Sequence, residues 1–302
     1  MEYTSSSVRD FYNLMKPRVM SLVIFTSFVG LVLSPVKIHP FIALISILCI
    51  AIGAGASGVL NMWYDSDIDR LMKRTINRPI PAGNINKNEA LTYGMVISAG
   101  SVVIMGILIN WSASFLLAFT IFFYAVIYTM WLKRRTMQNI VIGGAAGAFP
   151  PIIGWLSTGA PIAIEPLILF FIIFLWTPPH FWALAIVTSR DYEKANIPMM
   201  PNVVGNDYTK RQIVYYSIVM SISVIAPYYI GMVSILFLIP AIILSLVFII
   251  IALQLYKSSD DRKLKKHSKR LFLYSILYLF LIYILFLIDH MYKSYLGGVN
   301  FL

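Results

Sequence analysis

Nine long apolar runs dominate this sequence and set the strongest limit on its fold. They cover approximately residues 19–37, 41–63, 92–111, 113–132, 139–157, 165–187, 213–233, 235–255 and 271–291. A helix of about 20 apolar residues crosses a bilayer, and uninterrupted runs of this length are not strands of a membrane barrel. The sequence therefore predicts an all-α membrane protein with nine transmembrane helices. No linker or shift in composition divides residues 1–302 into more than one domain.

The composition agrees with this fold class and excludes a soluble domain. Hydrophobic residues make up 59% of the chain and charged residues 12%, whereas a soluble domain has about 45–50% apolar and about 25% charged residues. The net charge of +11 could indicate a nucleic-acid-binding protein, but the basic residues stand in short blocks between the apolar runs. Such blocks are typical of topology signals and of contacts with lipid headgroups. The expected partner is therefore the lipid bilayer, with no nucleic acid.

The basic residues also predict the orientation of the chain in the membrane. If the nine runs span the bilayer from a cytoplasmic N-terminus, all 24 lysines and arginines except Lys37 and Lys293 lie in cytoplasmic segments. Cytoplasmic loops of membrane proteins carry an excess of Lys and Arg. The distribution therefore predicts a cytoplasmic N-terminus, with the long loops after the second and sixth runs on the same side.

A polar stripe ends the second apolar run. Asn61, Asp65 and Asp69 are spaced four residues apart, so on a helix they share one face. Two carboxylates one turn apart repel each other, and near the membrane this repulsion is poorly screened. Mg²⁺ relieves it, because that ion is bound by one or two carboxylates together with waters and substrate phosphates. The alternative is an acidic helix end that faces water, as we expect for Asp67.

A basic patch follows this stripe directly. Arg70, Lys73, Arg74 and Arg78 lie within the next nine residues. An acidic stripe beside a basic patch suits a metal-bridged diphosphate, because guanidinium groups bind phosphate oxygens in a forked geometry. Anchoring by the positive-inside rule explains part of this charge. It does not explain why Pro79, Pro81 and Gly83 follow, which indicate a loop with a defined non-helical path.

The sixth run contains a histidine beside two prolines. Pro178 and Pro179 are predicted to break the backbone hydrogen bonds of the helix and to place His180 at a kink. An intramembrane histidine is a candidate functional residue. Alternatively, His180 bonds a carbonyl that the prolines free. The aromatic neighbours Trp176, Phe181 and Trp182 suit an interfacial belt, core packing or the wall of an apolar site equally well.

Two glycines four residues apart, Gly143 and Gly147, lie in the fifth run. Small residues at this spacing let helices approach closely in membranes. Close helix packing is therefore the favoured interpretation, and a cavity wall is the alternative.

At these residues the chain resembles the UbiA-type intramembrane prenyltransferases, and more closely their haem O synthase branch. The general pattern Asn-x₃-Asp-x₃-Asp is matched by Asn61, Asp65 and Asp69. Blocks similar to the branch follow in order from about Lys16 to Gly205: Lys16–Val19, Asp67–Thr75, Asn77–Pro79, Ile142–Pro151, Trp176–Trp182 and Asn196–Pro201. The resemblance implies a UbiA-like helical bundle with a central cavity.

The resemblance also implies an activity. The family branch transfers the farnesyl group of farnesyl diphosphate to the 2-vinyl group of haem B, with addition of water, and so makes haem O and diphosphate. Carried over to this sequence, Asp65 and Asp69, aided by Asn61, hold Mg²⁺ against the diphosphate. Arg74, Arg78 and Lys73 would neutralise the leaving group, and His180 would orient or ligate haem B. These assignments are expectations for this chain.

The chain departs from the wider superfamily at a second acidic repeat. Many relatives carry Asp-x₃-Asp after the sixth span, but here Asp191 is followed four residues later by Ala195. A complete second metal site is therefore not expected, and Asp191 and Lys194 are assigned to the diphosphate side. The resemblance places the protein in a bacterial inner membrane as a multi-pass protein, with the mouth of the active site on the cytoplasmic side. A haem A synthase or a terminal oxidase assembly is a candidate partner.

Two other functions fit part of this pattern. A UbiA-type enzyme could prenylate a quinone or chlorophyll precursor, although the block Trp176–Trp182 is similar to the haem O synthase branch. A small-molecule transporter with broken helices and a midplane ion site would instead place polar residues near the centres of the runs. In this sequence they gather at the predicted cytoplasmic ends, which favours an enzyme.

Overall fold

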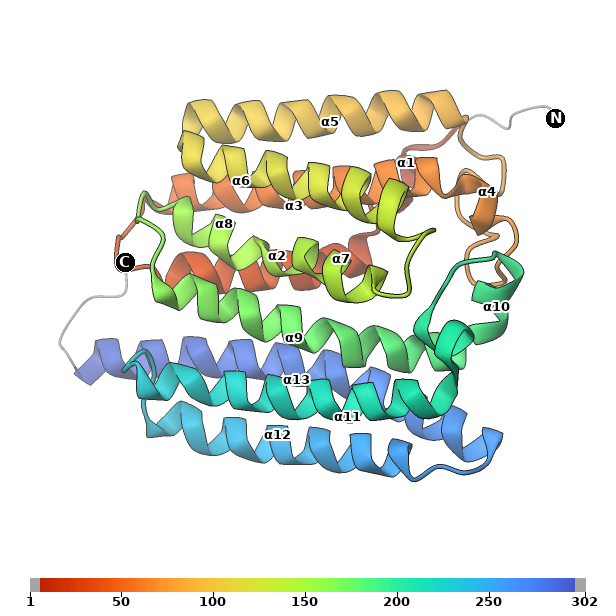
Figure 1. Cartoon of the computed structure of the whole chain (residues 1–302). Helices are drawn as coiled ribbons and strands as arrows, with labels where there is room; N and C mark the ends of the chain where they lie inside the picture. Colours follow the sequence, from red (N-terminus) through yellow and green to blue (C-terminus); the bar gives the residue numbers. More distant parts are fainter. Residues whose placement is uncertain (1–5, 297–302) are drawn as a thin grey trace.

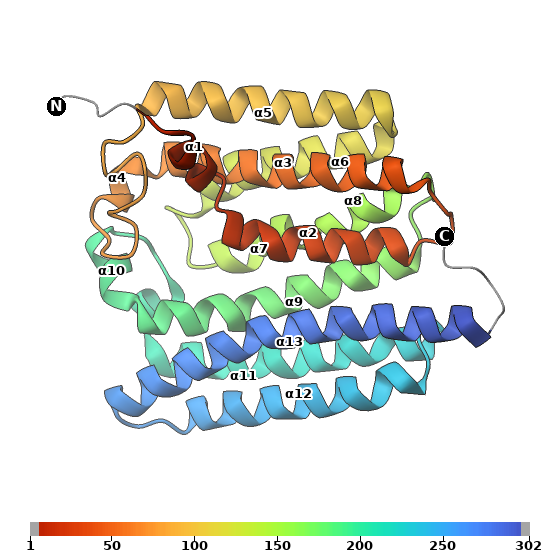
Figure 2. The same cartoon turned by 180° about the vertical axis from the view of Figure 1, so that it is seen from behind.

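The computed structural model describes residues 6–296, which contain helices and turns but no strand. In chain order the helices are α1 Val8–Leu14, α2 Pro17–Val32, α3 Pro40–Tyr64, α4 Ser66–Asp69, α5 Lys87–Leu108, α6 Trp111–Phe122, the π-helix η1 Phe123–Leu132, α7 Asn139–Ala148, α8 Pro150–Leu156, α9 Ile164–Val187, α10 Ser189–Lys194, α11 Met200–Tyr229, α12 Ile235–Tyr256 and α13 Asp261–Leu296. The long helices lie side by side, roughly parallel and antiparallel, and the short helices α1, α4 and α10 lie toward one end of the bundle (Figures 1 and 2).

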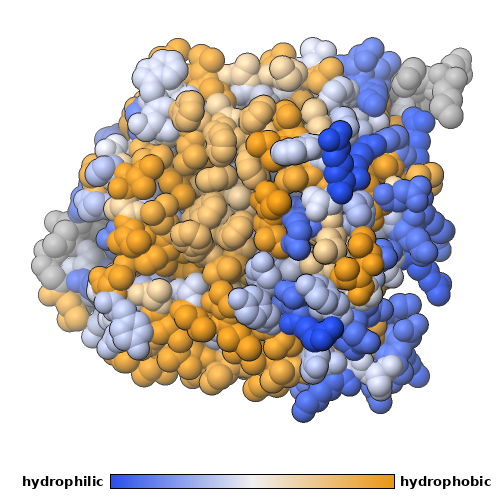
Figure 3. All heavy atoms as spheres, in the orientation of Figure 1, coloured by the Kyte–Doolittle hydropathy of each residue, from blue (hydrophilic) through white to orange (hydrophobic). Residues whose placement is uncertain are grey.

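The predicted membrane spans correspond to these helices. Among the described residues, eight spans are long and apolar enough to cross a bilayer, counting α6 with η1 and α7 with α8 as one span each. A ninth is obtained if α1 and α2, which meet at an angle of 56°, form one broken span. The break lies at Lys16, whose φ of +55° is left-handed. On the face seen in Figure 3, apolar residues cover much of the bundle, and hydrophilic residues concentrate at the end that holds α4 and α10.

The core divides into two main groups of helices. One apolar cluster is formed mainly by α9, α11, α12 and α13, and a second by α3, α5, α6 and α8. The two groups meet through α2, α7 and α8 (Figure 1). At the crossing of α2 and α8, a Cβ atom on Gly30 would lie 2.1 Å from the Pro151 carbonyl oxygen, and one on Gly154 would lie 2.0 Å from that of Ser27. Only glycine permits this backbone approach.

The two glycines that the sequence singled out in α7 differ in their surroundings. A Cβ atom on Gly143 would lie 2.2 Å from Cδ2 of Tyr128, whereas one on Gly147 would meet nothing within 4 Å. The predicted close packing is therefore confirmed at Gly143. At Gly147 it is wrong, because this position faces open space.

Pro178 and Pro179 do not end the helix that contains them, although each lacks the N–H group of a helical hydrogen bond. Helix α9 runs from Ile164 to Val187 through both prolines, and His180 lies on its continuous course. Neighbouring helices and hydroxyl side chains allow prolines inside membrane helices. Here α7, α11 and α13 pack around α9. Tertiary packing thus holds the helix where local preference predicts a break.

Candidate active site

The predicted polar stripe lies where α3 passes into α4. Asn61 is in the last turn of α3, Asp65 joins the two helices, and Asp69 ends α4. The backbone N–H of Asp65 donates to the Asn61 carbonyl, and that of Asp69 to the Asp65 carbonyl, both at 2.9 Å. The four-residue hydrogen-bonding pattern therefore continues across the junction. All three side chains are buried, with exposures of 4%, 0% and 2%.

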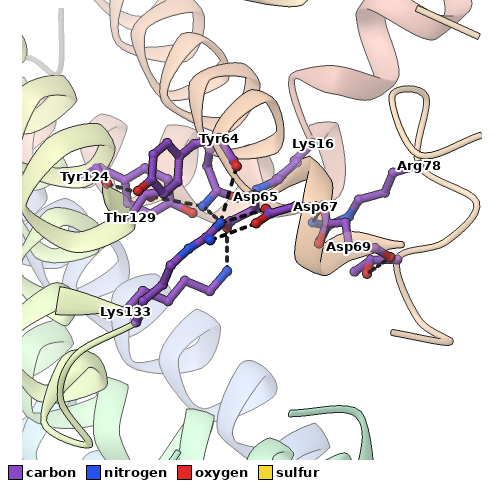
Figure 4. A network of polar contacts seen from close by, with 12 residues as sticks. Lys16, Tyr64, Asp65, Asp67, Asp69, Arg78, Tyr124, Thr129 and Lys133 are labelled. Carbon is purple, nitrogen blue, oxygen red and sulfur yellow. Dashed lines mark hydrogen bonds and ion pairs between the residues drawn. The ribbon is translucent and has the colours of Figure 1, made fainter. Parts of the chain in front are cut away.

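Three basic side chains from different segments contact the stripe (Figure 4). The Lys133 ammonium lies 2.5 Å from Oδ2 of Asp65, and Nη1 of Arg78 lies 2.7 Å from Oδ2 of Asp69. Lys16 Nζ donates to Oδ1 of Asn61, also at 2.5 Å. A buried carboxylate requires a paired charge, and the described structure supplies one to each aspartate.

A fourth cation, Arg134, lies at the edge of the cluster. Its Nη1 and Nη2 groups donate to the two carboxylate oxygens of Asp67 at 2.8 and 2.7 Å, and Nη2 lies 3.6 Å from Oδ1 of Asp65. These hydrogen bonds lower the pKa of Asp67 and raise that of Arg134. The Asp67 side chain is 58% exposed, as expected for an acidic residue that faces water, but it is also paired with Arg134.

The asparagine connects the acidic stripe to the fourth span. Its Nδ2 group donates to Oδ2 of Asp65 at 2.8 Å and to the hydroxyl of Thr129 at 3.0 Å. Thr129 and Lys133 come from η1 and the residue that follows it. Lys16 belongs to the sequence block Lys16–Val19 named above. No spacing in the sequence connects Lys16, Thr129 or Lys133 with the stripe.

One oxygen of the cluster has no hydrogen-bond partner. Oδ1 of Asp65 is buried, and the nearby Nη2 of Arg134 is beyond hydrogen-bonding distance. Within residues 6–296, no group of three or more His, Cys, Asp or Glu side chains could hold a metal ion. An orphaned carboxylate oxygen one helical turn before a second buried carboxylate fits Mg²⁺ instead, because that ion keeps waters and substrate phosphates in its coordination sphere. Asp65 and Asp69 are thus the residues that could hold it.

Comparison with known proteins adds to this geometry. The model of the UbiA prenyltransferase family matches residues 23–289. The chain belongs to this family. It is 55% identical over 286 residues to "Protoheme IX farnesyltransferase 2" of Mesorhizobium japonicum, covering 95% of this chain and 91% of the relative. It is also 54% identical to "Protoheme IX farnesyltransferase" of Rhizobium etli, covering 98% and 95% of the two chains.

Solved structures share the fold of this UbiA family member. A digeranylgeranylglyceryl phosphate synthase superposes with a TM-score of 0.76 at 19% identity, over 94% of this chain and 98% of the other. A UbiA homologue from Archaeoglobus fulgidus, bound to DMAPP and Mg²⁺, superposes with a TM-score of 0.63 at 17% identity, over 89% and 99%. The all-α membrane fold predicted from the apolar runs is therefore confirmed.

Four other predicted site residues of this family member lie near the same end of the bundle. Lys73 and Arg74 are exposed on the segment between α4 and α5, Asp191 is half-buried in α10, and Lys194 is exposed at its end. Helices α4 and α10 both lie at this end (Figure 1). Within the described part of the chain, none of these four residues forms an ion pair with a protein side chain.

His180 lies elsewhere, where α9 packs against α13. Its Nδ1 atom is 2.6 Å from the Ser275 hydroxyl, and its ring stacks between Trp176 and Phe272 at centroid distances of 4.3 and 4.7 Å. The hydrogen-bond partner of the His180 ring is thus the Ser275 hydroxyl and not a carbonyl freed by the prolines. Among the contacts of residues 6–296, none joins His180 to the Asn61–Asp65–Asp69 stripe.

Replacing Lys133 by methionine is expected to destabilise the protein. The loss should be about 2 kcal/mol, below the about 3–5 kcal/mol typical of a broken buried ion pair, because Asn61 and Arg134 still neighbour Asp65. Thermal unfolding in detergent measures the change. Lys194→Met removes an exposed lysine and is the matched control, expected within about 0.5 kcal/mol of the parent. Equal losses in both variants would contradict the pairing.

Proposed function

We propose that this chain is a protohaem IX farnesyltransferase, which makes haem O from haem B and farnesyl diphosphate. The observation that carries the proposal is the identity of 54–55% to relatives with this name over nearly the whole chain. In the reaction the C1–oxygen bond of farnesyl diphosphate breaks and diphosphate leaves. C1 bonds to the terminal carbon of the 2-vinyl group, and the other vinyl carbon takes a hydroxyl group from water as a proton is released.

The polar stripe is proposed as the diphosphate side of the site. Asp65 and Asp69, with Asn61, would hold Mg²⁺, and a UbiA homologue of the same fold was solved with Mg²⁺ and a prenyl diphosphate. Bound there, the ion supplies positive charge to the phosphate oxygens. Arg78 approaches Asp69 from the same loop that carries Lys73 and Arg74. In this proposal these three side chains neutralise the leaving group electrostatically.

The apolar part of the bundle is proposed to protect the reactive intermediate. Departure of diphosphate leaves an allylic cation, and excluding bulk water until the vinyl group attacks prevents its early hydrolysis. Asp191 and Lys194, both in α10, would lie on the diphosphate side of the site. His180 would contact haem B from α9, where the aromatic rings of Trp176 and Phe272 already form an apolar stack around it.

The mouth of the site is proposed to open to the cytoplasm. Basic residues surround the carboxylate stripe, and hydrophilic residues concentrate at this end of the bundle (Figure 3). Because cytoplasmic segments carry the excess of Lys and Arg, this end and the N-terminus would both be cytoplasmic. Reporter fusions after α3 and α12 should indicate cytoplasmic positions, and an external position for either would contradict the orientation.

A reaction of the purified protein tests the proposed function. The chain is incubated with haem B, Mg²⁺ and prenyl diphosphates of ten, fifteen and twenty carbons, and the haem is extracted for mass spectrometry. We expect one product with the mass of haem B plus a farnesyl group and a hydroxyl group, formed only with Mg²⁺ present. Absence of any prenylated haem, together with prenylation of an added quinone precursor, would overturn the proposal in favour of another UbiA-type activity.

A further inference from the structure

The fourth span changes from an α-helix to a π-helix as it approaches the candidate site. Helix α6 ends at Phe122, and η1 continues as a π-helix through Leu132. In a π-helix each N–H bonds the carbonyl five residues back, and such segments are rare and frequently lie at functional sites. This pattern extends to the Lys133 N–H, which donates to the Tyr128 carbonyl at 2.9 Å.

The π-helix determines which side chains face α3. Buried residues recur every fourth position along the span: Ala113, Leu117, Ile121, Ala125 and Thr129. In an α-helix, residues four apart are displaced by about 40°, so that such a series would drift by about 160° from first to last. The wider turns of η1 counter this drift. They keep Thr129, which is fully buried, on the side that packs against α3.

The hydrogen bonds of Thr129 orient the Asn61 amide. The Thr129 hydroxyl donates its single hydrogen to the Tyr124 carbonyl, five residues back, at 2.8 Å. It can therefore only accept from Asn61, whose Nδ2 group lies 3.0 Å away. The second hydrogen of Nδ2 goes to Asp65. With both donors used, the amide oxygen Oδ1 is directed to the opposite side, where the Lys16 ammonium lies.

We propose that Thr129 is a positioning residue, which the π-helix η1 brings to Asn61 so that the Asn61 amide oxygen stays turned away from η1 and available to a bound cation. The proposal rests on the proposed function, in which the cation is Mg²⁺ bound with diphosphate. Thr129 acts through Asn61 and contacts neither the ion nor the substrate. Loss of its hydroxyl leaves one Nδ2 hydrogen without a partner in a buried site, so the amide is oriented by its contacts with Asp65 and Lys16 alone.

Two substitutions separate the hydroxyl from the shape of the side chain. Thr129→Val keeps the branched shape but removes the hydroxyl, whereas Thr129→Ser keeps the hydroxyl. The measurement is Mn²⁺ binding to the purified protein in the presence of inorganic diphosphate, followed by electron paramagnetic resonance. Residues that orient metal ligands typically contribute about 10–100-fold to affinity. We expect T129V to weaken Mn²⁺ binding by this factor and T129S to remain within about threefold of the parent.

A double substitution tests whether the effect passes through Asn61. In an Asn61→Ala background, T129V should weaken Mn²⁺ binding no further, because residues that act as one unit are not additive. Equal weakening in T129V and T129S, an unchanged T129V, or a full additional loss in the double variant would each overturn the role of Thr129. A parent protein that binds no Mn²⁺ with diphosphate would overturn the proposed metal site itself.

Discussion

Replacing Asp65 by asparagine is expected to abolish measurable farnesyl transfer while leaving the protein folded. The substitution preserves the size of the side chain and its ability to accept a hydrogen bond from Asn61. It removes the negative charge and replaces the unpaired oxygen Oδ1. A metal ion at a transferring phosphate contributes several kcal/mol. We therefore expect a fall of about a thousandfold in turnover, measured as haem O formed by the purified variant.

The matched control for this prediction is Asp67→Asn. The same chemical change is made two residues away, at a side chain that is 58% exposed and paired with Arg134. Its turnover should stay within a few-fold of the parent. Gel filtration and thermal unfolding verify that both variants are folded. Normal haem O production by D65N, or equal loss in D65N and D67N, would contradict the assignment of Asp65 to the metal.

Replacing Gly154 by alanine is expected to have the largest effect on stability. The new Cβ atom would lie 2.0 Å from the Ser27 carbonyl oxygen and 2.9 Å from its carbonyl carbon. These are backbone atoms of α2, so no side-chain rotation can relieve the contact and the two helices must separate. Overpacking typically costs about 1–3 kcal/mol and occasionally more. For this backbone clash we expect about 3 kcal/mol, measured as a lower Tm in detergent.

Gly147→Ala provides a control in the same membrane span. Gly147 lies in α7, and its Cβ atom would meet nothing within 4 Å. Alanine is favoured over glycine inside a helix by about 1 kcal/mol, so the Tm should be unchanged or slightly higher. A Tm for G154A equal to that of G147A would show that α2 and α8 cross at a greater distance than described.

The candidate site was only partly predictable from the sequence. Asn61, Asp65 and Asp69 could be placed on one face because the spacing of four is local and the helical hydrogen bonds continue from α3 into α4. The role of Arg78 as a partner of Asp69 was not predicted, although both lie in one segment. His180 was predicted beside two prolines at a kink; α9 runs as one helix through both prolines, packed by α7 and α13.

The sequence by itself determined the class of fold and the acidic stripe. Long apolar runs leave the helix as the structure that satisfies their backbone in lipid, and a spacing of four directs side chains to one helix face. Only the tertiary structure decided which residues complete the site. Lys16, Thr129 and Lys133 are separated from their partners by 45 to 68 residues. Their contacts depend on how the helices pack and on the π-helical turns of η1, and apolar periodicity does not specify either.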